Sequence, residues 1–351
     1  MLSITLLAPC SVLLAAALLS APAAQDDTPA KPAPPSLKAA DEPTVFLASD
    51  GRPAESGRIP EDTPADALER WETLKNGRRV NGQSPAPIRS LVLSFDAELR
   101  ESADKIRKDT QLTIEYLEEG RGLLKTTFVG SKRISARGPD GDWMIVDGKL
   151  VDLGGRGDET SRIDHERWLA MTRNFCTISD AANARIVRIA ALDVTPFHEG
   201  APLERVKLGT QVLIDLPTPE LGSLARKLTW LEVDSPDFVI QDVVETDLGK
   251  PRGVVRARLG LDPKTNRIVF AQIVPLGKGK PVETRSALSY VPQWTKAVDQ
   301  IWIPENLMVY RMLPQEGRIL YDIAPTVDLF VRKSESRINP RLEPSKFLPP
   351  K

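Results

Sequence analysis

A spacing of two between apolar residues is the feature that most restricts how this chain can fold. Over residues 88–100 every second residue is apolar, and the residues between them are mostly polar. Successive side chains of a β-strand point to opposite faces, so this pattern predicts a strand with one apolar face and one largely solvated face. The apolar face must be buried against another part of the chain. Its members are Leu91, Leu93, Phe95, Ala97 and Leu99.

The same pattern recurs along the chain and predicts about ten strands. The Gly-containing link at 119–121, the Asp147-Gly148 pair and the Pro-containing stretch 262–266 are typical of turns between strands. Because links of hairpin length join antiparallel neighbours, we expect an antiparallel meander. The predicted strands cover 88–100, 110–120, 122–130, 142–153, 204–215, 226–234, 237–246, 252–260, 267–275, 301–312, 317–323 and 326–334.

Residues 64–76 have the spacing of an amphipathic helix instead. Thr63 can cap its first turn, and Leu68, Trp71 and Leu74 are spaced to share one face. We expect that face to dock on the apolar side of the sheet.

A second helix is predicted over 161–176, where Ser161 and Asp164 form a capping-box pattern. A third, short helix over 179–190 is an alternative to a strand there. With the strands, these helices predict one α+β domain over residues 64–351, in which helices cover the concave face of the sheet. The apolar stripe of the second helix comprises Trp168, Met171 and Phe175.

The first 24 residues are typical of a secretory signal. Residues 2–24 carry no charge, are rich in Leu and Ala, and end in small residues before the polar Gln25. We therefore predict a signal peptide over 1–24 that is cleaved; a retained membrane anchor is the alternative. Residues 25–63 are rich in Pro, Ala, Asp and Ser, and this composition predicts a mobile linker.

The two cysteines, Cys10 and Cys176, leave one thiol after such cleavage. Leu7-Ala8-Pro9-Cys10 has the outline of a lipidation site, but it precedes most of the apolar run. A single thiol cannot form an internal disulfide. We interpret Cys176 as a small buried apolar residue.

Composition and motifs favour no enzyme class. The chain has 47 basic and 48 acidic residues, a balance that argues against nucleic acid as a partner, and only two His, which leaves few ligands for a metal. We predict no cofactor and no catalytic residue. His165-Glu166 begins like a metalloprotease motif, but Leu169 occupies the position of the second His. A hydrolase that uses His165 or His198 is the remaining enzymatic alternative, and it requires a carboxylate or nucleophile beside the imidazole.

Large apolar side chains are the remaining candidates for a functional surface. They fall on predicted strands and helix stripes at Trp143, Trp168, Trp230, Trp302, Phe238, Phe270, Met308 and Tyr310. For any one of them, ordinary core packing is the more common explanation. A curved sheet under helices can also enclose an apolar cleft, in which each buried methylene of an acyl chain contributes about 0.8 kcal/mol. We expect this cleft to be lined by Leu93, Phe95, Trp143, Trp168, Met171, Trp230, Phe270 and Tyr310.

Several strings resemble the LolA/LppX-like family of periplasmic lipoprotein carriers, the outer membrane lipoprotein-sorting proteins. They are the helix ADALERWETLKNG, the strand–turn–strand VVRARLGLDPKTNRIVFAQIVPL with Asn266 near the usual Gly, and the hairpin WIPENLMVYRML with RILYDI. The ending, Asn339-Pro340 and then Phe347-Leu348-Pro349, is similar to the closing tail of the family. The resemblance implies a LolA-like fold, an antiparallel half-open β-barrel covered by two or three helices.

The resemblance also implies a function. Family members carry lipids or lipoproteins without a cofactor or covalent catalysis. We therefore expect an exported, non-enzymatic, monomeric carrier or chaperone, periplasmic or secreted, that binds the acyl chains of lipids or lipoproteins in its cleft. Envelope membrane proteins are further expected partners. The alternative is a non-catalytic interaction or sensor module of the cell envelope on the same fold.

Overall fold

The computed structural model describes residues 45–350, with gaps, and the predicted signal peptide, residues 25–44 of the predicted linker, Cys10 and His198 lie outside the described residues. No helix among the described residues is both long and apolar enough to cross a bilayer. The gaps are 103–104, 119–121, 131, 154–158, 194–204, 209–210, 215–225, 241–252, 275, 278–279, 282–286, 297–300, 316–317 and 323–326.

Seventeen of the described strands belong to one antiparallel sheet, which is more than the sequence predicts, and β13 (Leu276–Gly277) and β14 (Lys280–Pro281) form a separate pair. The large sheet contains β1 (Ser90–Ser102), β2 (Lys105–Leu117), β3 (Leu123–Phe128), β4 (Arg133–Gly138), β5 (Gly141–Val146), β6 (Lys149–Val151), β7 (Arg188–Leu192), β8 (Arg205–Leu208), β9 (Gln211–Ile214), β10 (Thr229–Ser235), β11 (Val255–Leu261), β12 (Ile268–Val274), β15 (Ala287–Lys296), β16 (Trp302–Gln315), β17 (Arg318–Asp322), β18 (Val327–Val331) and β19 (Arg337–Ile338).

The strand order is a meander in which one pairing, between β1 and β18, joins segments that are far apart in the sequence. From one edge it runs β6, β5, β4, β3, β2, β1, β18, β16, β15, β12, β11, β10 and β7. The prediction of antiparallel hairpins is confirmed. In the described residues β6 pairs only with β5 and β7 only with β10, so the sheet is open and not closed into a barrel.

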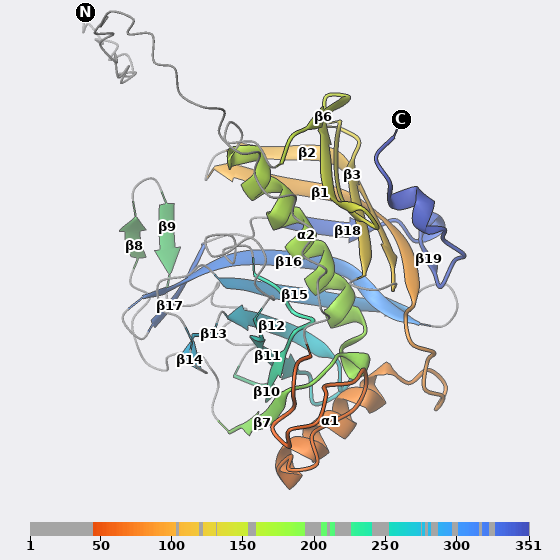
Figure 1. Cartoon of the computed structure of the whole chain (residues 1–351). Helices are drawn as coiled ribbons and strands as arrows, with labels where there is room; N and C mark the ends of the chain where they lie inside the picture. The colour runs from red at the N-terminus through yellow and green to blue at the C-terminus, as the bar shows by residue number, and fades with distance from the viewer. Residues whose placement is uncertain are drawn as a thin grey trace, which may run out of the picture. The chain divides into compact units, whose positions relative to one another are not determined.

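Helix α2 (Glu159–Ser179) lies across one face of this sheet (Figure 1). It contacts β3, β4 and β16 and begins two residues before the predicted cap Ser161. The predicted stripe is confirmed, because Trp168, Met171 and Phe175 are at most 7% exposed. These side chains meet the inner face of β1, where Leu91, Leu93, Phe95 and Ala97 are buried as the alternation predicted.

Helix α1 (Ala65–Arg78) contacts β7 and β10 near the other edge of the sheet. Trp71 and Leu74 are buried, but Leu68 is 43% exposed, and Ala67 occupies the buried face instead. The predicted stripe is therefore wrong at Leu68. The predicted cap is also wrong, because the Thr63 hydroxyl donates to the carbonyl of Pro60 and not to the helix.

The two turns with the strongest sequence signals form as predicted. Asp147 and Gly148 both have positive φ, 49° and 79°, as the two-residue turn between β5 and β6 requires. Asn266 ends the turn between β11 and β12 with φ of 57°, a conformation that Asn and Gly tolerate best.

Three parts of the described chain differ from prediction. Strands β4 and β15 were not predicted. Over 179–190, where a short helix was predicted with a strand as the alternative, residues 181–183 form a single 3-10 turn and β7 begins at Arg188. Residues 237–240 belong to no strand. Residues 45–63, expected in the linker, contact the domain: the amides of Ser49 and Gly57 donate to the carbonyls of Val187 and Ala184.

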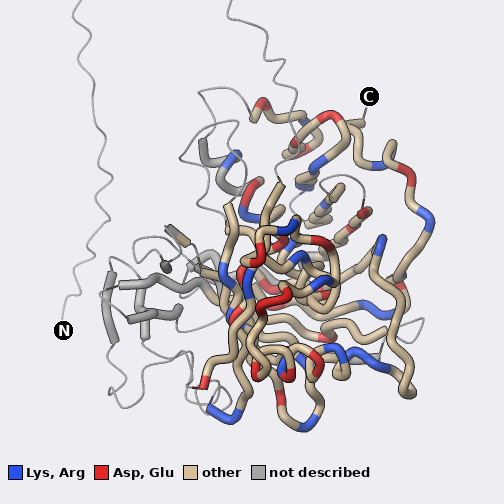
Figure 2. The backbone as a smooth tube through the Cα atoms, turned by 60° about the horizontal axis from the view of Figure 1, so that its bottom comes forward, with Lys and Arg blue, Asp and Glu red and all other residues tan. Residues whose placement is uncertain are grey.

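The opposite face of β7, β10 and β11 carries a ladder of ion pairs that we call the outer ladder. Acidic and basic residues are interspersed along the described chain (Figure 2). Here Glu232 and Asp234 of β10 are only 5% and 6% exposed. Arg256 Nε lies 2.7 Å from Asp234 Oδ1, and Arg188 Nη1 and Arg258 Nε lie 3.0 Å and 3.2 Å from the two oxygens of Glu232.

Candidate functional site

Four of the eight residues predicted to line the cleft lie together. Leu93 and Phe95 of β1 and Trp168 and Met171 of α2 belong to one buried cluster between helix and sheet. Phe95 packs edge-on against Phe175 with ring centroids 5.5 Å apart. This cluster is the main core of the described domain.

The other four predicted residues lie elsewhere. Trp143 belongs to a separate cluster, and its indole N–H donates to the carbonyl of Phe347 at 2.7 Å. Trp230 and Phe270 form an edge-on pair with centroids 5.8 Å apart. Tyr310 lies 3.7 Å from the sulfur of Met308.

Alternation along the strands explains this separation. Leu231 and Val233 belong to the main core, so Trp230 points to the opposite face, and Ala271 and Val309 place Phe270 and Tyr310 there in the same way. The eight residues therefore do not line one common surface.

A shallow recess that is open to solvent lies where the ends of five elements meet. Its walls come from the last turns of α1 and α2, the start of β12, the end of β15 and the start of β16. None of the eight predicted residues lines it. The lining residues are Leu74, Gly77, Arg78, Pro85, Ile178, Ser179, Ala181, Asn266, Arg267, Ile268, Trp294, Ile301 and Trp302.

The recess depends on a close approach between α1 and the turn before β12. A Cβ atom built on Gly77 would lie 2.0 Å from the carbonyl oxygen of Asn266, so only glycine fits. Arg267 Nε donates to the carbonyl of Gly77 at 3.2 Å. The end of α1 and the hairpin between β11 and β12 are thus bonded to each other, and both contribute residues to the wall of the recess.

Two arginines give this otherwise apolar recess its charge. The Arg267 guanidinium lies over the ring of Trp302, 3.4 Å from its centroid. Arg78 pairs with Asp180. Burial lowers the pKa of both arginines, and for Arg78 the neighbouring Asp180 opposes that effect.

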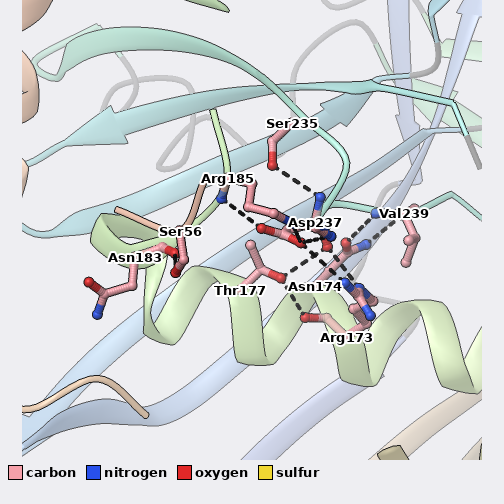
Figure 3. A network of polar contacts seen from close by, with 9 residues as sticks. All are labelled: Ser56, Arg173, Asn174, Thr177, Asn183, Arg185, Ser235, Asp237 and Val239. Carbon is pink, nitrogen blue, oxygen red and sulfur yellow. Dashed lines mark hydrogen bonds and ion pairs between the residues drawn. The ribbon is translucent and has the colours of Figure 1, made fainter. Parts of the chain in front are cut away.

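A polar network, which we call the α2 network, fastens the second half of α2 to the loop after β10 (Figure 3). The Asn174 side chain exchanges two hydrogen bonds with the backbone of Val239, at 2.8 Å and 2.9 Å, and donates to the hydroxyl of Tyr290 at 2.9 Å. Asp237 accepts from Arg173 at 3.2 Å and from Arg185 at 2.6 Å. Any movement of α2 away from the sheet must break these bonds.

The histidine alternative finds a carboxylate but no nucleophile. His165 is buried, and its Nε2 lies 3.7 Å from Asp142 Oδ2. Burial opposes ionisation of Asp142, but the two hydrogen bonds from Arg137, at 2.8 Å and 2.9 Å, outweigh it and hold the pKa of this carboxyl well below its usual range. Among the described residues neither imidazole nitrogen has a hydrogen-bond partner. His165 therefore forms no nucleophile–base pair in that part of the chain.

Cys176 behaves as interpreted from the sequence. It lies in the main core at 6% exposure, and burial raises the pKa of its thiol to about 12. A thiol that stays protonated and buried is a poor nucleophile.

No family model and no curated protein matches this sequence. The structure is similar to an outer membrane lipoprotein-sorting protein domain from Vibrio parahaemolyticus, with 12% identity over 80% of this chain and 96% of that chain and a TM-score of 0.36. It is also similar to a DUF1329 family protein from Desulfovibrio piger, with 12% identity over 80% and 97% and a TM-score of 0.39. The predicted resemblance to lipoprotein-sorting proteins is confirmed as a likeness, and at these TM-scores it assigns neither family nor activity.

Proposed function

We propose that this protein is an exported, non-enzymatic carrier that binds a lipid or lipoprotein acyl chain against the inner face of its sheet. The observation that carries the proposal is the recess. The recess is open to solvent at the end of α2, where a ligand could enter. Its apolar walls, which include Ile178, Ile268 and Ile301, belong to the same buried cluster as Leu93, Phe95, Trp168 and Met171.

This continuity suggests a path for the ligand. One end of the ligand would occupy the recess at the end of α2, and the acyl chain would extend along α2 toward Trp168 and Met171. Each methylene that leaves water contributes about 0.8 kcal/mol, so a dozen methylenes can offset the loss of several hydrogen bonds in the α2 network. In this proposal the bonds at Asn174 and Asp237 act as a latch that opens when the chain enters.

Trp143, Trp230, Phe270 and Tyr310 have a different place in the proposal. They pack on the face of the sheet opposite to α2. A longer ligand would contact them only if it passed around an edge of the sheet. Periplasmic location, cleavage of the signal peptide after residue 24 and a monomeric state belong to the same proposal.

Mass spectrometry of the full chain, purified without detergent, tests this function. We expect co-purified acyl lipids, together with uptake of a fluorescent fatty acid. Pro85→Trp places an indole at the recess and should weaken uptake about tenfold, because it fills space that the ligand needs. Ala86→Trp is the matched control, since Ala86 is exposed and does not line the recess. An empty protein that takes up no acyl probe would contradict the proposal.

An interaction module remains the second candidate, and one observation favours it. β6 is a short edge strand that pairs only with β5 among the described residues, and its Leu150 is 62% exposed. An exposed strand edge can accept a strand from another protein. Binding of an envelope protein that Leu150→Lys abolishes, without any acyl uptake, would favour this function.

A further inference from the structure

Two hydrogen-bond donors in the recess have no acceptor among the described residues. Arg78 Nη2 and Trp302 Nε1 are both buried from solvent, and neither has a hydrogen-bond partner there. Both side chains line the recess. A buried donor without an acceptor is costly, and a charged one is more so.

In the described part of the chain Asp180 pairs with Arg78 through Nη1, and no carboxylate lines the recess. The residues that line the recess include two arginines and no Asp or Glu. Asp180, the partner of Arg78, is already committed: its Oδ2 accepts from the amide of Ile88 at 2.9 Å, and its Oδ1 accepts from Asn183 at 2.9 Å. Burial lowers the pKa of Arg78 and of Arg267, which indicates that both charges have lost part of their hydration.

A ligand with an anionic oxygen would supply an acceptor for these donors and a negative charge beside the two arginines. An anionic ligand could accept from Arg78 Nη2 or from Trp302 Nε1, and Arg267 would add a second positive charge over the indole ring. The remaining walls are mostly apolar, with Leu74, Ile178 and Ile268 among them and Ser179 and Asn266 as polar residues. The combination of an oxyanion site with apolar walls fits an amphiphile.

We propose that the recess binds the anionic head group, a carboxylate or a phosphate, of a single-chain amphiphile, through Arg78, Arg267 and Trp302. This inference rests on the proposed carrier function and assigns the chemical class of its ligand. It places the head group in the recess, and the acyl chain runs along α2 toward Trp168 and Met171.

Binding of four probes to the full chain at pH 7.5 tests the inference: dodecanoate, dodecyl phosphate, dodecanol and inorganic phosphate. We expect the two anionic amphiphiles to bind at least about tenfold more tightly than dodecanol, the effect of one charge-assisted hydrogen bond. Inorganic phosphate should bind far more weakly, since it buries no hydrocarbon.

Two substitutions locate the effect. Trp302→Phe removes one donor but keeps an aromatic ring beside Arg267, and Arg78→Lys keeps the ion pair with Asp180 but removes the second nitrogen. Each should reduce the preference for anionic probes over dodecanol by about tenfold, the effect of one charge-assisted hydrogen bond. Circular dichroism and thermal melting verify that both variants are folded.

The outcomes separate this inference from the proposed function. Equal binding of dodecanol and dodecanoate, or a preference that survives both substitutions, overturns the anionic site and leaves the carrier function standing. Tight binding of inorganic phosphate equal to that of dodecyl phosphate overturns the amphiphile. Failure of all four probes to bind overturns the inference and contradicts the carrier function as well.

Discussion

Two arginine-rich regions of this protein differ in one respect, which is whether each guanidinium has a carboxylate partner. In the outer ladder Arg188, Arg256 and Arg258 surround the buried carboxylates of Glu232 and Asp234 at 2.7–3.2 Å. In the recess Arg78 has one partner outside the lining, and Arg267 has the Trp302 ring. The ladder satisfies itself, whereas the recess has donors left over, and this difference is what distinguishes a structural cluster from a candidate binding site.

We expect the largest loss of stability when one arginine of the outer ladder is removed. Arg256→Met leaves two buried carboxylates short of a partner and should lower the free energy of unfolding by about 3 kcal/mol. Arg267→Met in the recess removes only the stacking contact and one hydrogen bond, so we expect a loss of about 1 kcal/mol. Urea denaturation of both variants measures the difference. Equal losses would show that the two regions have the same structural role.

A smaller effect is expected at the wall of the recess. Gly77→Ala forces a Cβ against the Asn266 carbonyl, 2.0 Å away, and should destabilise the protein by about 2 kcal/mol while it weakens binding of the acyl probe. Gly253→Ala is the control, because no atom lies within 4 Å of its Cβ position and its φ is not in the left-handed region. A fully stable Gly77→Ala protein with normal uptake would show that the close approach of α1 is not needed.

The smallest effect concerns the reverse case, a carboxylate without an arginine. Burial and the nearby Glu98 raise the pKa of Asp328 in β18 from 3.8 to about 6. A raised pKa means that the folded state holds the proton more tightly, so this stabilisation is complete below about pH 4 and is lost as pH rises through about 6.

Asp328→Asn should therefore raise the free energy of unfolding by about 1 kcal/mol at pH 7.5, a value reduced for the partial solvent exposure of the group, and change it little at pH 3.5. Thermal melts at the two pH values provide the measurement. Asp96→Asn is the control, because Asp96 is exposed. A stabilisation of equal size at both pH values would show that the charge of Asp328 is not its cause.

Where the sequence failed, tertiary context supplied the missing information. β15 contains Pro292, which argues against an interior strand, yet its pairing with β12 ends at Tyr290, so the missing amide hydrogen falls beyond that ladder. β4 was missed because its inward residues, Ser135 and Arg137, are polar. The recess was missed because no local pattern joins Arg78, Arg267 and Trp302.

The sequence by itself determined the elements and their turns: the alternation of β1, the stripe of α2 and the positive φ at Asp147, Gly148 and Asn266. These are local properties, set by side-chain direction and backbone sterics. The tertiary structure decided which face of each strand is inner, and it brought residues from 74 to 302 around one recess. A spacing of two between apolar residues shows that the two faces of a strand differ. Only the packing of the core decides that Leu231 lies on the inner face and Trp230 on the other.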